Sequence, residues 1–261
     1  MLGSLISGGK WRWGAYGKHP IAADYIRLGD FTPLMNGFSD WVANGFKALS
    51  LGKNSGHQPC SWRFWAKGPQ KGEIICGLVR DSCDSIGRPY PLLILGSGPL
   101  KNWEERWDLL PFACEKSWDQ TEYISSQMFS DFKRLDTEFR NMKSPQPEWD
   151  ECRTRRDELM EFSESMERDP TGYLLHLKNA VHEASGKPEG FFSLDPAMFR
   201  DQLTAVNYLY HLLIERNNNA PNAMFLGGTL DMAFMSYYRR PLASDDFMAL
   251  WTVASHNMEK E

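Results

Sequence analysis

Short hydrophobic runs between glycine- and proline-containing turns dominate the first hundred residues of the chain. Four of these runs are rich in aromatic and β-branched residues, which is typical of buried strands. They cover residues 11–16, 61–67, 73–80 and 90–96. A helix is expected between the first two runs, because Thr32 can cap it, Pro33 occupies its first position and an apolar stripe follows through residues 34–49.

Apolar residues in the middle of the chain recur every three or four positions, which is the spacing of an amphipathic helix. This spacing persists over residues 124–142 and predicts one helix there, ended by the prolines of segment 144–147. A second helix is expected from about Pro147 and a third over residues 171–184. A long helix is expected from Asp195, whose carboxylate can cap it.

Strand character returns in the last forty residues. Residues 222–228 and 231–239 flank a glycine-containing turn and are typical of a β-hairpin. Ser244 is followed by two aspartates and is expected to begin a final helix. A hydroxyl cap and first-turn carboxylates stabilise the free amide groups at a helix start.

The order of these elements predicts an α/β fold in one domain over residues 1–261. The early strands and the C-terminal β-hairpin would form one sheet with helices on its faces, and the hairpin would make this a mixed sheet rather than a purely parallel one. Residues 105–215 would be a helical elaboration of the domain. A chain of 261 residues, of which 42% are hydrophobic, has enough apolar side chain for such a core.

The charge pattern does not favour a nucleic-acid or membrane partner. The formal net charge is -5, and acidic and basic residues are interleaved along the chain. The first residues lack the apolar run of a signal peptide, and no later stretch approaches the roughly 20 apolar residues of a membrane span. The five cysteines include no Cys-x-x-Cys pair, which favours reduced thiols. We therefore expect a soluble cytoplasmic protein.

The sequence patterns that bind phosphate or metal are incomplete. Segment 12–19 has Arg12 where a phosphate-binding loop needs its first glycine, and His19 where that loop needs Ser or Thr. His182 and Glu183 are followed by Ala-Ser-Gly, without the second histidine that zinc proteases carry one turn later. No cofactor and no metal are expected.

One cysteine is a candidate for nucleophilic catalysis. Cys83 lies in a turn with Arg88, and a nearby cation can lower a thiol pKa and activate the thiolate. Asp81 and Asp84 act in the opposite direction, because like charge disfavours a thiolate. The alternative function is therefore a small hydrolase or transferase that uses Cys83, with Asp84 and a distant histidine such as His211 as helpers.

Charged residues gather in two turns between the early strands. Lys18, Asp24 and Arg27 lie in one of them. Asp84 and Arg88 lie in the other, where glycine and proline restrict the backbone. Such residues can pair to fix the shape of a loop, or they can face a partner. Both readings stay open at this stage.

These turns resemble segments of the TagF (ImpM) family, which is associated with bacterial type VI secretion. The family's Tyr-Gly-Lys-x-Pro, Asp-aromatic-aliphatic-Arg and helical Trp are matched by Tyr16, Gly17, Lys18, Pro20, Asp24, Tyr25, Ile26, Arg27 and Trp41. Two further segments are matched by Trp62, Arg63, Phe64, Asp84, Gly87, Arg88, Tyr90, Pro91 and Leu92. A late segment is similar over residues 222–250. The order of the matches makes them more specific together than singly.

The resemblance implies a three-layer αβα sandwich and a non-enzymatic, cytoplasmic role. Family members resemble post-translational repressors that act through the forkhead-associated scaffold protein of the secretion apparatus. The sequence departs from the family pattern at residues 21–23 and 224–225, and its segment 105–215 has no match in that pattern. Candidates for partner binding or loop locking are Lys18, Asp24, Arg27, Arg63, Asp84 and Arg88.

Overall fold

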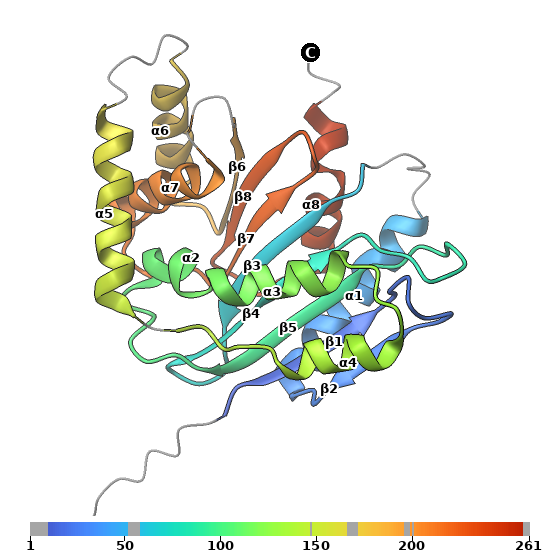
Figure 1. Ribbon diagram of the computed structural model, residues 1–261. Coiled ribbons are helices and arrows are strands. Elements are labelled where there is room, and N and C mark those ends of the chain that lie inside the picture. The colour runs from blue at the N-terminus through green and yellow to red at the C-terminus, as the bar shows by residue number, and fades with distance from the viewer. Residues whose placement is uncertain are drawn as a thin grey trace, which may run out of the picture.

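Eight strands form one continuous sheet at the centre of the molecule (Figure 1). The computed structural model describes residues 10–51, 58–146, 148–165, 172–195, 199 and 201–257. The strands are β1 (Arg12–Gly17), β2 (Ile26–Gly29), β3 (Ser61–Lys67), β4 (Glu73–Arg80), β5 (Leu92–Pro99), β6 (Glu189–Leu194), β7 (Ala223–Gly228) and β8 (Ala233–Tyr238). Their order across the sheet is β2-β1-β5-β4-β3-β7-β8-β6.

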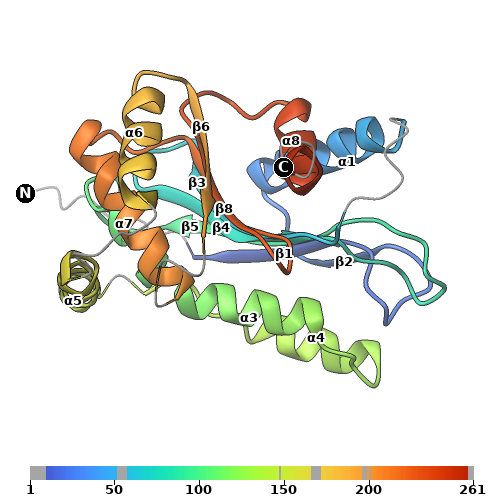
Figure 2. The same cartoon turned by 90° about the horizontal axis from the view of Figure 1, so that it is seen from above.

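Helices cover both faces of this sheet, so the fold is the expected three-layer αβα arrangement (Figure 2). Helices α1 (Pro33–Leu51) and α8 (Ser244–Asn257) pack side by side on one face. The other helical elements are η1 (Trp107–Leu109), α2 (Leu110–Ala113), α3 (Glu115–Ser126), α4 (Phe132–Arg140), α5 (Trp149–Ser165), α6 (Tyr173–Ala184) and α7 (Gln202–Arg216). Most of the predicted helical segment 105–215 therefore lies on the opposite face from α1 and α8.

The α/β class is confirmed, but the expectation of a mixed sheet is wrong. Every strand pairing in the described part of the chain is antiparallel. Short connections join β1 to β2, β3 to β4, β4 to β5 and β7 to β8, and a hairpin connection requires antiparallel neighbours. The helix-containing connections do not join neighbouring strands: β2 and β3, and also β5 and β6, lie far apart in the sheet, whereas α7 joins β6 to β7, which lie on either side of β8. None of these connections therefore creates a directly paired parallel βαβ unit.

Aromatic side chains fill the core between the sheet and the α1–α8 pair. Trp41 of α1 packs against Phe225 of β7 and Phe247 of α8, with ring centroids 5.6 and 5.5 Å away. The indole N–H of Trp41 donates to the carbonyl of Ala243 over 2.7 Å, which satisfies its polar atom. This hydrogen bond joins α1 to the residue that precedes α8.

Two helical predictions differ from the structure. The predicted helix over 124–142 is interrupted, because the backbone becomes extended at Gln127 (φ -79°, ψ 141°) and a new helix is capped by the side chain of Asp131. The helix expected from Asp195 begins later, at Gln202, and its cap is Asp201. Residues 196–198 and 200, between Asp195 and Asp201, lie outside the described residues.

Other sequence predictions are confirmed. Thr32 accepts a hydrogen bond from the amide of Met35 over 3.3 Å at the start of α1. The C-terminal hairpin forms as β7 and β8, with Gly228 opposite Ala233. Helix α8 begins at Ser244. Strands β2 and β6 were not predicted, and β6 places part of the segment 105–215 at the edge of the sheet.

Candidate functional site

The two charged turns meet at one end of the sheet. Residues 18–25 connect β1 to β2, and residues 81–91 connect β4 to β5. The amide of Ser85 donates to the carbonyl of Ala22 over 2.8 Å, and the guanidinium of Arg88 donates to the carbonyl of Ala23 over 2.6 Å. We call these two connections the two-loop corner, which projects from the right of the molecule in Figures 1 and 2.

The register of the sheet brings the two loops together. Gly17 at the end of β1 pairs with Leu92 at the start of β5, so the chain leaves β1 beside the segment that enters β5. Gly17 has a φ of +132°, and a Cβ atom there would overlap the carbonyl oxygen of Pro91. A glycine is therefore required for this close approach of the two loops.

Asp84 is the centre of the corner. Its carboxylate is completely buried and lies 3.0 Å from the ammonium of Lys18 and 2.6 Å from the Nε atom of Arg88. It also accepts hydrogen bonds from the amides of Ile86 and Arg88, over 3.2 and 2.9 Å. Lys18 is buried as well, whereas the Arg88 side chain is half exposed. A buried carboxylate with two cations and two amide donors is fully compensated.

The surroundings of Asp84 hold its pKa well below the usual range. Desolvation raises the pKa, but four hydrogen bonds to the carboxylate lower it by more. The donors are the Arg88 amide, the Lys18 ammonium, the Arg88 guanidinium and the Ile86 amide. The ionised carboxylate is therefore part of the folded structure at neutral pH.

His19 fixes the corner to the helical layer. Its Nε2 atom lies 3.2 Å from the carbonyl oxygen of Ile124 in α3, and its Nδ1 atom accepts from the amide of Ile21 over 3.2 Å. These two contacts fit a neutral ring with the proton on Nε2. Burial is the largest effect on this histidine and lowers its pKa, which agrees with a neutral structural role.

The outer surface of the corner combines aromatic, aliphatic and charged groups. Tyr25 is 47% exposed and packs edge-on against Tyr90, with ring centroids 4.7 Å apart. Ile86 is 69% exposed. Asp24 lies 4.0 Å from Arg88, and both side chains are largely in solvent, so this pair adds little stability. These four residues can be contacted from outside.

Two predicted site residues lie elsewhere. Arg27 donates to the amide oxygen of Asn36 over 2.9 Å and stacks on Phe31 at 4.0 Å, at the junction of β2 and α1. Arg63 of β3 forms a two-point ion pair with Glu122 of α3, over 2.6 and 2.7 Å. The charge of Arg63 is therefore neutralised within the chain, whereas Arg27 contacts an uncharged amide and an aromatic ring.

The alternative catalytic set is not brought together. Cys83 forms an isolated β-bridge with Pro89 inside the β4–β5 loop. His211 belongs to α7 and pairs with Glu215 over 3.3 Å. Helix α7 and the β4–β5 loop lie at opposite ends of the molecule in both overall views (Figures 1 and 2). Asp84, the third member, is occupied by Lys18 and Arg88.

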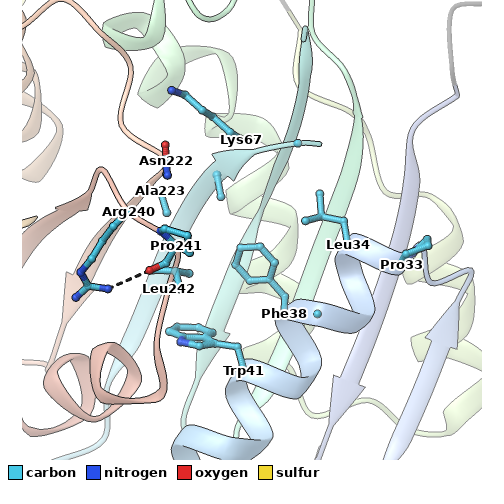
Figure 3. Close-up of a pocket in the computed structure, with 13 residues that line it drawn as sticks. Pro33, Leu34, Phe38, Trp41, Lys67, Asn222, Ala223, Arg240, Pro241 and Leu242 are labelled. Atoms are coloured by element: carbon cyan, nitrogen blue, oxygen red, sulfur yellow. Dashed lines mark hydrogen bonds between the residues drawn. The ribbon is translucent and has the colours of Figure 1, made fainter. Parts of the chain in front are cut away.

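A groove of about 610 Å³ lies at the other end of the central strands (Figure 3). Its floor comes from α1, from the end of β3 and the start of β7, and from the segment 240–242 before α8. Because β3 and β4 are antiparallel, Lys67 at the groove lies opposite Ile74, whereas Arg80 next to the two-loop corner lies opposite Ser61. The two features therefore occupy opposite ends of the same strands.

The part of the chain that the structure describes offers neither a cluster of metal ligands nor a membrane-spanning helix. Within it, no group of three or more His, Cys, Asp or Glu side chains could hold a metal ion. None of the helices there combines the length and the apolar character that a transmembrane passage needs.

A family model matches the part of the chain that contains the two-loop corner. Residues 14–141 match the TagF N-terminal domain, which is described as type VI secretion system-associated. These residues belong to the TagF family. The TagF domain contains the whole two-loop corner and α1, whereas the other wall of the groove, at 222–223 and 240–242, comes from later residues.

A solved structure extends the similarity of fold beyond the TagF domain. The crystal structure of PA0076 from Pseudomonas aeruginosa PAO1 superimposes with a TM-score of 0.52 at 15% sequence identity. The match covers 92% of this chain and 93% of PA0076. At this identity the likeness shows the fold alone. No curated protein sequence matched the chain.

Sequence reasoning found the corner residues but missed the groove. Lys18, Asp24, Asp84 and Arg88 are brought together as one cluster. The groove joins segments more than 150 positions apart in the sequence, and the local pattern predicts only the helix and strands that some of its lining residues belong to, not their contact. The one local signal is Gly37, a glycine in the middle of a helix.

Proposed function

We propose that this type VI secretion-associated protein is a non-enzymatic, cytoplasmic regulator that acts by binding another protein. Its partner is the forkhead-associated scaffold of the secretion apparatus, and its effect is post-translational repression of secretion. The TagF match supports the association with type VI secretion. The identity of the partner and the direction of regulation are what the family resemblance implies, applied here to this chain.

The two-loop corner is the surface that we assign to this contact. A network around the buried carboxylate of Asp84 fixes its backbone, while Asp24, Tyr25 and Ile86 remain exposed. A loop that is already ordered loses little conformational entropy when it binds. Exposed Tyr beside aliphatic and charged groups is also a common composition of protein interfaces. One observation supports this assignment above the others. The buried network around Asp84 fixes the two loops, while aromatic, aliphatic and charged side chains are exposed on their outer surface.

The test uses the bacterium that encodes the protein. A tagged chain is compared with the double variant Asp24→Lys and Ile86→Asp, which changes the corner surface without touching Lys18 or Asp84. Leu175→Asp is the matched control, because Leu175 is 63% exposed, similar to Ile86, and belongs to α6, on the opposite side of the molecule from the corner (Figures 1 and 2). Copurification of the forkhead-associated scaffold is quantified for each strain, together with the amount of a secreted type VI substrate.

We expect the double variant to lose scaffold binding and to increase secretion, as a deletion does, while Leu175→Asp behaves like the wild type. Deletion that leaves secretion unchanged contradicts the regulatory role. Equal scaffold recovery with the double variant and the wild type contradicts the assignment of the contact to the corner.

A further inference from the structure

The floor of the groove is apolar and rigid. Leu34, Phe38 and Trp41 of α1 face it, together with Pro241 and Leu242 (Figure 3). Phe38 stacks on Phe64 with ring centroids 5.2 Å apart, and the Trp41 indole is held by its hydrogen bond to Ala243. Since these rings are fixed by contacts behind them, the groove exists before any ligand binds.

Gly37 lines the groove without a packing reason inside the chain. A Cβ atom at Gly37 would meet nothing within 4 Å, although the residue lies within α1. Gly45 of the same helix is different, because a Cβ there would overlap Phe247 of α8. Glycine inside a helix costs about 0.5–1 kcal/mol relative to alanine. The open space above Gly37 lets a bulky group approach the helix backbone closely.

The charged groups of the groove are cations. Lys67 and Arg240 line it, and no aspartate or glutamate does. Arg240 is neutralised by Asp246 and Glu189. Within the described residues, Lys67 makes no direct ion pair, although Glu104 attracts its ammonium and Arg239 repels it from farther away. The partly buried Lys67 side chain extends from the rim away from Phe38 and Trp41 (Figure 3). The positive charge of Lys67 at this rim favours an anionic group on a ligand.

We propose that the groove binds a segment of a protein partner that carries a large apolar side chain next to carboxylates. The apolar side chain would lie on Phe38 and Trp41, and a carboxylate beyond it would pair with Lys67. The volume of about 610 Å³ accommodates one or two side chains rather than a folded domain. This inference goes beyond the proposed function, because it concerns the opposite end of the strands and holds for any partner with this chemistry.

The test uses the full chain and three capped pentapeptides, GFDDG, GFKKG and GADDG. Binding is followed by the NMR signal of the Trp41 indole N–H, which is assigned by its loss in a Trp41→Phe variant. GFDDG is expected to give a saturable shift with a Kd about threefold or more below that of GFKKG, the factor that one exposed ion pair can supply. GADDG, which lacks the large apolar side chain, is expected to give no saturable shift of the Trp41 signal.

Two pairs of variants control the result. Lys67→Glu should reverse the preference between GFDDG and GFKKG, and Lys67→Gln should abolish it. Gly37→Met should block binding, whereas Gly37→Ala, which adds a methyl group in open space, should retain it. Equal affinities for GFDDG and GFKKG would mean a purely apolar site and overturn the proposal. So would unchanged binding in Gly37→Met, or the absence of a saturable shift with every peptide. None of these results bears on scaffold binding at the two-loop corner.

Discussion

The ammonium of Lys18 lies 3.0 Å from the carboxylate of Asp84, and both side chains are buried. The two residues are 66 positions apart in the sequence and belong to different inter-strand loops. Their contact converts two separate turns into one structural unit. Lys18 is therefore a residue that fixes the shape of the corner, while Asp24 on the same loop is exposed.

Substitutions at this pair should destabilise the protein in a definite order. Asp84→Asn should lower the urea midpoint most, because it weakens contacts to two cations and two backbone amides. Lys18→Met should lower it less, since Arg88 still pairs with Asp84. Asp24→Asn should change stability by no more than about 0.5 kcal/mol, as expected for an exposed position. An Asp84→Asn midpoint equal to that of the wild type would show that the network is not needed for folding.

The pH dependence of stability should reveal the ionised state of Asp84. Its pKa is lowered in the folded protein, so its contribution is present above the unfolded value of about 3.9 and disappears as the pH falls through the lower folded value. The stability difference between the wild type and Asp84→Asn should therefore shrink when the pH is lowered from 7 to below about 4. Urea unfolding of both proteins at several pH values measures it. A difference that stays constant from about pH 5 to about pH 2 would contradict the lowered pKa.

The two glycines of α1 should respond oppositely to alanine. Gly37→Ala should stabilise the protein by about 0.5–1 kcal/mol, because alanine has the higher helix propensity and the added Cβ meets no atom within 4 Å. Gly45→Ala should destabilise it, since the added Cβ would overlap Phe247. Chemical denaturation of the two variants and the wild type measures the sign of each change in the free energy of unfolding. Stabilisation by Gly45→Ala would mean that α1 and α8 separate readily.

Cys83 should be dispensable. His211 is held on α7, both ring nitrogens of His19 contact backbone groups, and Cys83 itself lies in a β-bridge with Pro89. A Cys83→Ala strain should secrete as the parent strain does and should retain the bound scaffold. A phenotype equal to gene deletion, with the variant protein folded by circular dichroism, would restore the catalytic hypothesis.

Much of the fold could be predicted because its signals are local. The strands around Trp62 and the hairpin containing Phe225 have dense apolar runs bounded by glycine or proline. The continuous helix over 124–142 was wrong for a physical reason. Met128 fits the apolar stripe but is 83% exposed, and the Asp131 side chain favours a new helix start. Periodicity alone does not reveal such a break.

The candidate site was predictable only in part. The turn positions of Lys18, Asp84 and Arg88 could be read from the sequence, but their contact depends on the pairing of β1 with β5, which is not a local property. The same limit applies to Arg63, whose partner Glu122 lies 59 positions away on another element. Long-range register, rather than residue type, decides which charges neutralise one another.

The separation of the corner and the groove along the same strands has a consequence for assembly. Two polypeptides, one at each end, would not compete for space, and the antiparallel sheet between them would keep their distance and orientation constant. With both proposals taken together, a scaffold bound at the corner would leave the groove free for a second polypeptide.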